Sequence, residues 1–444
     1  MTTRLDEIEP RFRFFSVSLT SPRPKRLRLT AARVAGILLL ITSWGCVDPP
    51  GGGGLSGGSG AQGASADVLS GDPHPFGADD DTTFSVMTWN LEWFYDNETG
   101  DNYSDLAKQK SAPNRRAWNW HRDGIAAAIA EVRPTVVAVQ EAENRRVLWY
   151  LARALQRNHG LRYREFDVEG RDHATEQDVG FLVREPAEAL SISRHSLPRR
   201  LRDSDRFAAV SKHALLQIEW PSAGQTGDAP SVETDPLAVS DRSTIDRPGT
   251  GATRRIHLMN LHLRAGGDSA EERARQARAV RHWIRPLVLR GEHVIVLGDL
   301  NTSETGDEPG PGSELFVLLG RETSEPDDDL VDLHREIPSG RRRTHLLPGR
   351  QFDRILVTPS LLGDGDGRDV GDGRDVGDGR DVGDGRDVGD EPSWRLRSVT
   401  VRPDLAIRGR PDSPGEHWDR YWQIPDDERD LSDHYPVIAT FSLR

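Results

Sequence analysis

The chain has 444 residues, of which 35% are hydrophobic and 29% are charged, a balance typical of a soluble globular protein with one large core. Its formal net charge of −13 argues against tight nonspecific DNA binding through bulk charge, although a local basic cleft or a divalent metal could still bring nucleic acid to it. The single cysteine, Cys46, excludes an intrachain disulfide.

The first 46 residues have the pattern of a secretion signal. Several basic residues lie between Arg23 and Arg33, and they precede a short apolar run that reads VAGILLLITSW. Gly45 and Cys46 follow directly, and this arrangement resembles the signal of bacterial lipoproteins, in which the cysteine carries the lipid. We therefore predict an extracytoplasmic protein anchored to the membrane through Cys46. Plain secretion, an uncleaved anchor and a cytoplasmic protein with a disordered head are the alternatives.

Composition divides the rest of the chain. Residues 47–82 are rich in Gly, Ser and Asp, which predicts a disordered tether ahead of a folded domain at 83–444. Low-complexity loop inserts are predicted at 221–254 and 363–391. The second insert repeats the hexamer Asp-Gly-Arg-Asp-Val-Gly four times without variation. Because known calcium-binding repeats have a different spacing, we interpret it as a tandem duplication in a tolerated surface loop.

The predicted elements form a mixed α/β pattern. Apolar runs predict strands at 84–90, 135–141, 178–184, 214–220, 254–262, 293–299, 352–358, 395–401 and 436–443. Helical periodicity predicts helices at 115–132, 143–158 and 269–289. Ser269 and Glu272 have the spacing of a capping box at the start of the last helix. Helices alternate with strands early in the chain and strands follow one another later, which indicates an α/β sandwich with mixed sheets.

Polar side chains stand where several of these strands end or begin. They are Asn90, Glu141, His262, Asp299 and Asn301 at carboxyl ends, and Asp353, Asp433 and His434 at amino ends. Each has an ordinary interpretation by itself, such as a turn cap or a solvated strand end. Together they require a coincidence at one edge, because antiparallel strands would bring both kinds of ends to the same rim. Asp299 and Asn301 would point to one side if the chain stays extended.

This set of residues favours metal-assisted phosphoester chemistry. Hard oxygen ligands indicate Mg²⁺, with Mn²⁺ or Ca²⁺ as alternatives, in preference to zinc. A histidine beside a carboxylate can act as a general base, and amides can stabilise phosphoryl charge. We therefore expect water to cleave a phosphate ester at this rim.

The motifs around these residues resemble those of the endonuclease/exonuclease/phosphatase superfamily, also called the DNase I-like fold. The matching segments, in order, are TWNLEWF, AVQEAEN, GRDHATEQDVGFLVR, NLHL, LGDLNTS, FDRILVT and SDHYPV. They spread from Thr88 to Val437, and the combination of GDLN with SDHYP is specific. The resemblance implies a four-layer α/β/β/α sandwich with two mixed, mainly antiparallel sheets.

The resemblance also implies a role for each site residue. Glu141 would be the main metal ligand, with Asn90 and Asp433 acting through the metal or its waters. His434 would be a general base or a phosphate contact, oriented by Asp353.

Further roles follow for the remaining positions. Asp299 would position or activate the attacking water, and Asn301 would contact the phosphate. His262 would stabilise the phosphoryl group or the leaving oxygen, with either Glu176 or Asp178 as its carboxylate partner.

The implied substrate is nucleic acid, because FDRI, SDHYP and QEAEN resemble secreted bacterial nucleases most. Deoxyribonucleases of the family place a DNA-contacting arginine two residues after the metal-binding glutamate, where this chain has Glu143. This departure argues against minor-groove binding of duplex DNA. A phosphatase or sphingomyelinase-like phosphodiesterase is the alternative within the enzyme class, and a catalytically silent surface-binding module is the alternative outside it. We predict a monomer without a protein partner.

Two other runs stand near the motifs. The run RRRTH at 341–345 could line the phosphate side of the cleft or form a solvated charge run. The run EHWDRYW at 416–422 could stack on bases, although packing of the aromatic residues along a loop is the simpler interpretation.

Overall fold

The computed structural model describes residues 83–220, 255–363 and 393–443. These residues all belong to one compact unit, Pro73–Arg444. The predicted signal segment with Cys46, the tether, the insert at 221–254 and nearly all of the insert at 363–391 lie outside the described residues. Within the described part of the chain, no helix is long and apolar enough to cross a membrane.

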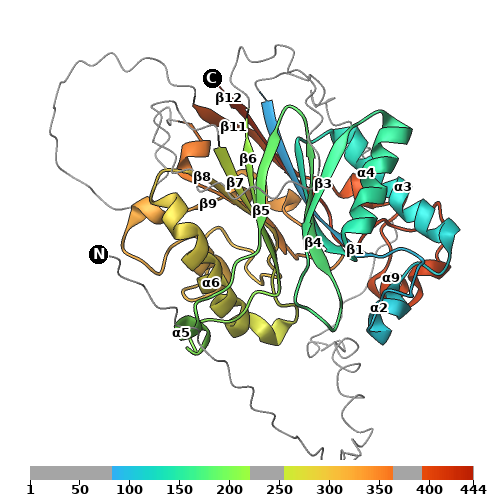
Figure 1. Cartoon of the computed structure of the whole chain (residues 1–444), viewed down its shortest axis with the longest axis horizontal. Helices are drawn as coiled ribbons and strands as arrows, with labels where there is room; N and C mark the ends of the chain where they lie inside the picture. The colour runs from blue at the N-terminus through green and yellow to red at the C-terminus, as the bar shows by residue number, and fades with distance from the viewer. Residues whose placement is uncertain (1–82, 221–254, 364–392, 444) are drawn as a thin grey trace, which may run out of the picture. The chain divides into compact units, whose positions relative to one another are not determined.

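Two six-stranded sheets form the centre of the domain (Figure 1). The first sheet has the order β11 (Trp394–Val401), β12 (Val437–Leu443), β1 (Thr83–Phe94), β2 (Val136–Ala142), β4 (Asp178–Arg184) and β3 (Tyr163–Val168). The second has the order β5 (Glu188–Ser193), β6 (Lys212–Glu219), β7 (Arg255–His262), β8 (His293–Asp299), β10 (Asp353–Val357) and β9 (Val331–Asp332). Each sheet contains one parallel pair, β1 with β2 and β7 with β8, and its other pairs are antiparallel.

Helices cover the outer faces of the two sheets. The described helices are α2 (Asp105–Lys110), α3 (Arg115–Val132), α4 (Arg145–His159), α5 (Arg199–Arg202), α6 (Ala270–Val288), α7 (Glu314–Leu318), α8 (Pro403–Ala406) and α9 (Pro414–Arg420). Figure 1 shows α3 and α4 on the side of the first sheet and α6 on the side of the second. The predicted four-layer α/β/β/α sandwich with mixed, mainly antiparallel sheets is thereby confirmed.

The predicted strands are all present, with boundaries shifted by no more than a few residues. The strands that the sequence pattern misses are β3, β5 and β9, which lie at sheet edges. An edge strand needs no continuous apolar run, because one side of it faces water, and β5 is largely exposed. The capping box predicted for α6 is wrong. Ser269 makes no side-chain cap bond, since its backbone (φ −94°, ψ 12°) lies outside the extended region that a cap requires.

The inner faces of the sheets follow the period of two of a β-strand. On β7 and β8, Leu258, Ile295 and Leu297 belong to the core between the sheets, while Met259 and Val296 pack beneath α6. Residues of the same parity as the first group therefore face the opposite sheet. His262 and Asp299 have that parity, so they end their strands on the inner face.

A buried amide connects the two sheets near these strand ends. The Asn260 side chain of β7 donates to the carbonyl oxygens of Val139 at 3.0 Å and Gly180 at 2.9 Å, both in the first sheet. Its own oxygen accepts a 2.7 Å hydrogen bond from the Gln140 amide. Asn260 is fully buried, so these hydrogen bonds fix the spacing and the register of the sheets next to the site.

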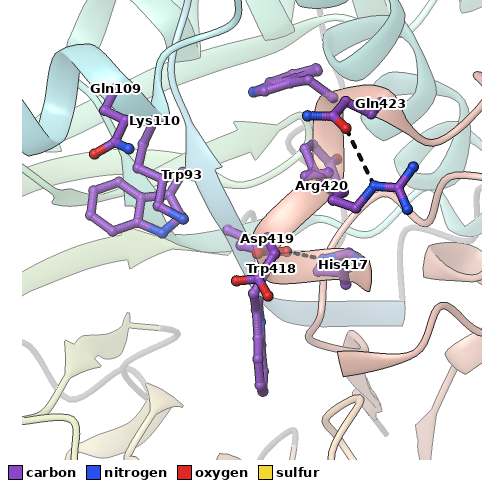
Figure 2. Close-up of a pocket in the computed structure, with 11 residues that line it drawn as sticks. Trp93, Gln109, Lys110, His417, Trp418, Asp419, Arg420 and Gln423 are labelled. Carbon is purple, nitrogen blue, oxygen red and sulfur yellow. Dashed lines mark hydrogen bonds and ion pairs between the residues drawn. The ribbon is translucent and has the colours of Figure 1, made fainter. Parts of the chain in front are cut away.

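The long connection between β11 and β12 carries α8 and α9. A pocket lies between the α9 segment and the end of β1 (Figure 2). The last strand, β12, follows this connection.

We expect Asn260→Leu to lower the free energy of unfolding by about 2 kcal/mol, because it removes the donor of two buried carbonyls and the acceptor of Gln140. Urea unfolding monitored by circular dichroism would measure the loss. Thr440→Val is the control, since the buried Thr440 hydroxyl has no hydrogen-bond partner among the described residues, and its removal should be almost neutral. Equal stability of Asn260→Leu and the parent would contradict the role of this amide.

Candidate active site

The predicted site residues converge, and they come from both sheets. Asn90 and Glu141 end the parallel pair of the first sheet, and His262 and Asp299 end the parallel pair of the second. Asp353 begins β10, opposite Asp299 in the register. The rim is therefore shared by two facing sheets, whereas we expected the rim of one sheet.

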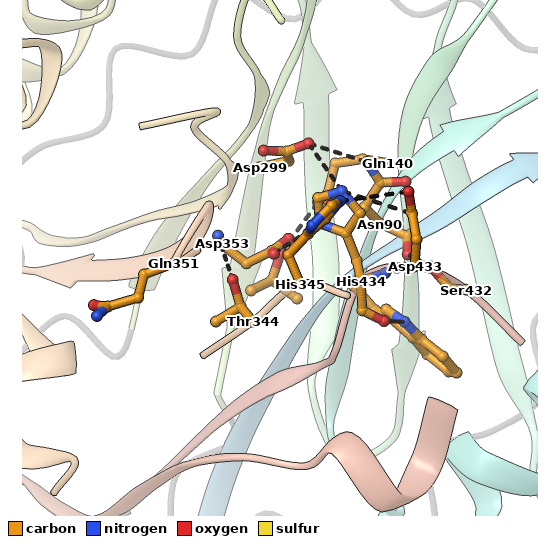
Figure 3. Close-up of polar contacts among 12 residues, drawn as sticks. Asn90, Gln140, Asp299, Thr344, His345, Gln351, Asp353, Ser432, Asp433 and His434 are labelled. Carbon is orange, nitrogen blue, oxygen red and sulfur yellow. Dashed lines mark hydrogen bonds and ion pairs between the residues drawn. The ribbon is translucent and has the colours of Figure 1, made fainter. Parts of the chain in front are cut away.

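His434 and Asp353 form a buried pair at the centre of this rim (Figure 3). The His434 Nδ1 atom lies 2.8 Å from Asp353 Oδ2, and its Nε2 atom lies 3.7 Å from Asp299 Oδ2. Burial by itself would lower the pKa of His434, but Asp353, Asp299 and Asp433 raise it well above its usual range. The imidazole is therefore held in one orientation, and its positive form is favoured by the surrounding carboxylates.

Hydrogen bonds to the backbone fix the positions of Asp353 and His434. The backbone N–H of Asp353 donates to the Thr344 hydroxyl at 3.1 Å, and the backbone N–H of His434 donates to the Ser432 hydroxyl at 3.0 Å. The Trp89 indole of β1 donates to the His434 carbonyl at 3.0 Å. These hydrogen bonds attach the His434–Asp353 pair to β1 and to the neighbouring loops, and they leave the imidazole little freedom.

Asn90 connects the carboxylates of the two sheets. Its amide nitrogen lies 3.1 Å from Glu141 Oε1 and 3.0 Å from Asp299 Oδ2, so it donates to one carboxylate of each sheet. Its oxygen, the atom suited to ligate a cation, accepts from the backbone N–H of Glu92 at 2.9 Å. In this arrangement Asn90 orients the carboxylates.

Glu141 reaches the site through an irregular backbone. It follows Gln140, which faces the second sheet, so simple alternation would turn Glu141 away from the site. Its φ of 61° and the register shift between Gln140 and Ala142 reverse that direction. Glu141 then accepts from the Asn90 amide and from the backbone N–H of Trp93 at 3.1 Å. Left-handed backbone at a residue other than glycine is uncommon and is typical of functional sites.

The Glu141 carboxyl carries an unfavourable negative charge. Burial raises its pKa to about 7, and Asp433 adds to this increase, while Lys212 opposes it. A divalent cation beside this carboxylate would remove the penalty, and carboxylate oxygens are the ligands that hard cations prefer.

Asp433 is held by two residues outside the predicted set. The Trp418 indole donates to Asp433 Oδ2 at 2.8 Å, and His345 Nε2 lies 3.4 Å from the same oxygen. The backbone N–H of Leu347 donates to the other His345 nitrogen at 2.9 Å, so the Nε2 atom carries the proton. Burial would raise the pKa of Asp433, but His345 and His434 lower it well below its usual range.

Asp299 stays ionised and Asn301 turns away from it. Burial opposes ionisation of Asp299, but His434, His262 and the N–H donors of Asn301 and Asn90 lower its pKa. The backbone N–H of Asn301 donates to Asp299 Oδ1 at 2.8 Å, and the Asn301 amide donates to the Leu263 carbonyl at 3.2 Å. Asn301 has a φ of 49°, so the chain does not stay extended, and the expected common direction of Asp299 and Asn301 is not found.

The structure corrects the carboxylate partner expected for His262, which was Glu176 or Asp178. Its Nε2 atom lies 3.7 Å from both Glu141 and Asp299, and its Nδ1 atom has no hydrogen-bond partner within the described ranges. Glu176 instead accepts from the backbone N–H groups at the start of α2, and Asp178 accepts from Gly170 N. Both assignments depended on the family resemblance of the segment GRDHATE, and Glu176 has a φ of 58°.

Lys212 is a site residue that the sequence pattern did not reveal. It pairs with His262 in the antiparallel register of β6 and β7, which places both side chains on the inner face. Its buried ammonium lies 2.9 Å from Gln177 Oε1 and 3.3 Å from Asp172 Oδ2. Burial lowers the pKa of His262 to about 3, and Lys212 contributes to this decrease. Lysine at the start of a strand is ordinary in sequence, so only the register identifies it.

The described residues offer suitable groups for a divalent cation. Three clusters bring ligand atoms within 4.8 Å of one another, and the third, Asp412 with His417 and Asp430, lies outside the predicted site. The other two are His345 with Asp433 and His434, and Asp299 with Asp353 and His434. Glu141 is linked to Asp299 of the latter cluster through Asn90 and His262. Because the set is dominated by buried carboxylates, it fits a hard cation of the Mg²⁺ type.

Comparison with known proteins agrees with this geometry. Residues 87–434 match the sequence pattern of the Endonuclease/Exonuclease/phosphatase family. This chain belongs to that family. Its members are hydrolases that act on phosphoester bonds and generally use divalent metals. No curated protein sequence matches the chain significantly.

Several solved structures resemble this family member. A humanized zebrafish (D. rerio) TDP2 with 14 mutations is 14% identical, with a TM-score of 0.44, over 81% of this chain and 99% of that one. A Bacteroides thetaiotaomicron mannosyl-6-phosphatase is 15% identical, with a TM-score of 0.44, over 81% and 99%. The human Nocturnin catalytic domain with bound sulfate is 12% identical, with a TM-score of 0.43, over 82% and 94%.

Cation affinity should depend on pH through Glu141. Since the pKa of Glu141 is about 7, a cation must displace a proton in more acidic solution. We expect the affinity for Mn²⁺ to fall by up to about tenfold per pH unit below pH 7 and to level off above it. Titration calorimetry on either side of pH 7 measures this. Glu141→Gln should bind weakly without this dependence, and a parent affinity that does not change with pH would contradict the assignment.

Proposed function

We propose that this protein is a divalent-cation-dependent phosphodiesterase that acts on nucleic acid outside the cytoplasm. The observation that carries the proposal is the buried alignment of Asp353, His434 and Asp299, with 2.8 Å and 3.7 Å between successive groups. This alignment places a positively charged imidazole between two carboxylates, of which Asp299 stays ionised.

The protein's own residues divide the work of hydrolysis. Asp299 keeps its charge in a buried position, so it suits the orientation of a water molecule and the acceptance of its proton. His434 stays positive beside three carboxylates, so it suits a contact to a phosphoryl oxygen, with Asp353 fixing its ring. In this division His434 acts as the phosphate contact, one of the two roles expected for it.

Two further side chains favour a negatively charged reacting group. Lys212 and His262 are paired on the inner face of the second sheet, and His262 lies 3.7 Å from Asp299. We assign Lys212 the neutralisation of phosphoryl charge and His262 a hydrogen bond to the phosphoryl or leaving oxygen. A cation held by Glu141 and Asp433 would supply further charge stabilisation when bound.

The residues at the start of α4 make contacts that argue against binding duplex DNA in the way that the deoxyribonucleases of the family bind it. Glu143, in the position of their DNA-contacting arginine, is buried and accepts from the backbone N–H of Asp96 at 3.0 Å. Arg146 pairs with Asp96 and Asp101, both at 2.9 Å, and Arg145 lies 3.4 Å from Glu165. Neither arginine is available without breaking an ion pair. A phosphatase or sphingomyelinase-like activity remains the alternative that the experiment must separate.

Purified full-length protein with Mg²⁺ should cleave at least one of single-stranded DNA, duplex DNA and RNA in preference to sphingomyelin and inositol phosphates. His434→Ala should reduce the rate by about 10²- to 10⁴-fold, because the site loses its charged phosphate contact. Lys212→Met should reduce it less, and Lys212→Met with Asp172→Asn controls for the unpaired carboxylate.

Three outcomes would contradict this proposal. Nucleic-acid cleavage that survives His434→Ala would exclude the mechanism. Turnover of lipid or inositol phosphate without cleavage of nucleic acid would exclude the nuclease. A correctly folded parent that binds nucleic acid and cleaves none of the substrates would favour the silent module.

The proposed membrane attachment rests on the sequence around Cys46, outside the described residues. We expect the protein to incorporate a radioactive fatty acid in a bacterial host and Cys46→Ser to lose both the label and the membrane association. Membrane association that persists in Cys46→Ser would point to an uncleaved anchor.

A further inference from the structure

An aromatic pocket adjoins the site on the side of α9 (Figure 2). Its volume is about 170 Å³, and its lining includes Trp93, Lys110, Trp418, Arg420 and Gln423. Figure 2 shows Trp93 and Lys110 on one side and Arg420 with Gln423 on the other. Since a cavity of about 150 Å³ holds a benzene ring, this pocket has room for a planar ring.

The pocket is one hydrogen bond away from the carboxylates of the site. The backbone N–H of Trp93 donates to Glu141 at 3.1 Å, and the Trp418 indole donates to Asp433 at 2.8 Å. Glu92, which also lines the pocket, accepts from the backbone N–H of Asp433 at 2.9 Å. The pocket therefore borders the residues that hold Glu141 and Asp433 in place.

A buried ionic contact joins the walls of the pocket. His417 lies between Glu92 and Asp412, with its Nδ1 atom 2.8 Å from Asp412 and its Nε2 atom in contact with Glu92. Burial would lower the pKa of His417, but these carboxylates raise it to about 11, so the imidazole stays charged. Glu92 and Trp93 have φ values of 45° and 48°, which turn the chain at this point. The ion pair of His417 with Glu92 thus connects α9 to the end of β1.

The aromatic residues of the α9 segment serve two different purposes. The Arg429 guanidinium packs on Trp120, Tyr421 and Trp422, at 4.4 to 5.5 Å from their ring centroids. For Tyr421 and Trp422, packing along the loop is therefore part of their role. Trp418 differs, since it contacts the site through its indole nitrogen.

The rim of the pocket carries two cations without acidic partners in the described part of the chain. The Lys110 ammonium lies 5.6 Å from the centroid of the Trp93 ring, and Arg420 contacts Gln423 at 3.3 Å. Asp419 is the exposed carboxylate among the lining residues. In a protein of net charge −13, unpaired cations beside an aromatic surface suit a ligand that combines a planar ring with negative charge.

We propose that this pocket binds the unstacked base of the nucleotide next to the scissile phosphate, with Lys110 and Arg420 near an adjoining phosphate. The inference rests on the proposed function and narrows its substrate to single-stranded or unpaired nucleic acid. A base inside a duplex is stacked on its neighbours and must leave the helix to reach such a pocket. Any base can stack on tryptophan. The pocket therefore selects single-stranded over duplex nucleic acid and does not select a base sequence.

The test compares binding of two single strands of equal length by fluorescence anisotropy, one with bases and one with abasic residues throughout. Full-length protein carries His434→Ala in every sample, which prevents turnover. Trp93→Ala should weaken binding of the normal strand about tenfold or more and leave the abasic strand unchanged, because it removes a stacking surface. Trp93→Phe should restore most of the affinity.

Matched controls lie elsewhere on the same chain. Trp149 is an exposed tryptophan on α4 that also packs with a cation, Arg153, at 5.3 Å, and it does not line the pocket. Trp149→Ala should leave binding of both strands unchanged. Lys110→Ala should weaken binding of both strands and flatten its salt dependence, whereas Lys108→Ala, on the exposed side of α2, should do neither.

The outcomes separate this inference from the nuclease proposal. Equal losses on both strands in Trp93→Ala, a comparable loss in Trp149→Ala, or a matched duplex that binds as tightly as the single strand would overturn the pocket assignment. If strand binding depends on Trp93 but the parent cleaves no nucleic acid, the pocket stands and the catalytic proposal fails. If neither binding nor cleavage occurs, both fail.

Discussion

The face-to-face packing of the two sheets is the constraint on which the rest of the structure depends. Asn90 and Glu141 belong to one sheet and His262, Asp299 and Asp353 to the other, so neither sheet contains a complete site. The parallel pair at the centre of each sheet directs two carboxyl ends to the same edge. The buried Asn260 amide then fixes how those edges meet. Within each sheet, a slip of one strand by a single residue would exchange its inward and outward side chains and dismantle the site.

The site concentrates negative charge in a region with little water. Glu141, Asp299, Asp353 and Asp433 converge around His434, and burial makes each charge costly by itself. Hydrogen-bond donors offset part of this cost, and they include the amide of Asn90 and the indole of Trp418. Both oxygens of Glu141 accept a hydrogen bond, yet burial still raises its pKa to about 7. A buried carboxylate of this kind is a natural place for a cation in a family whose members generally use metals.

The departures from the deoxyribonuclease pattern concern the surfaces beside the site that could contact a substrate. Glu143 supports the backbone at Asp96, where a DNA-contacting arginine would otherwise project. Aromatic and basic groups lie instead between the end of β1 and α9, on the other side of Glu141 and Asp433. Both features support the proposed substrate, a nucleic acid whose bases are already free of a helix.

Much of this protein could be predicted from its sequence, because apolar periodicity and short motifs are local properties. The interior strands and the long helices follow from those patterns, and edge strands such as β5 do not, since water satisfies one of their sides. The eight polar positions at strand ends were also visible, as was the pairing of His434 with Asp353 through the family resemblance. The tertiary structure decided which way the side chains of the site point and which residues they contact. The left-handed backbone at Glu141 and Asn301 overrides simple alternation, and it brings Glu141 inward. Glu176 accepts from backbone N–H groups before α2 and makes no contact with His262 among those that the described residues show. Lys212, His345 and Trp418 join the site from segments distant in sequence, because side-chain contacts across two sheets depend on register and packing that no local pattern encodes.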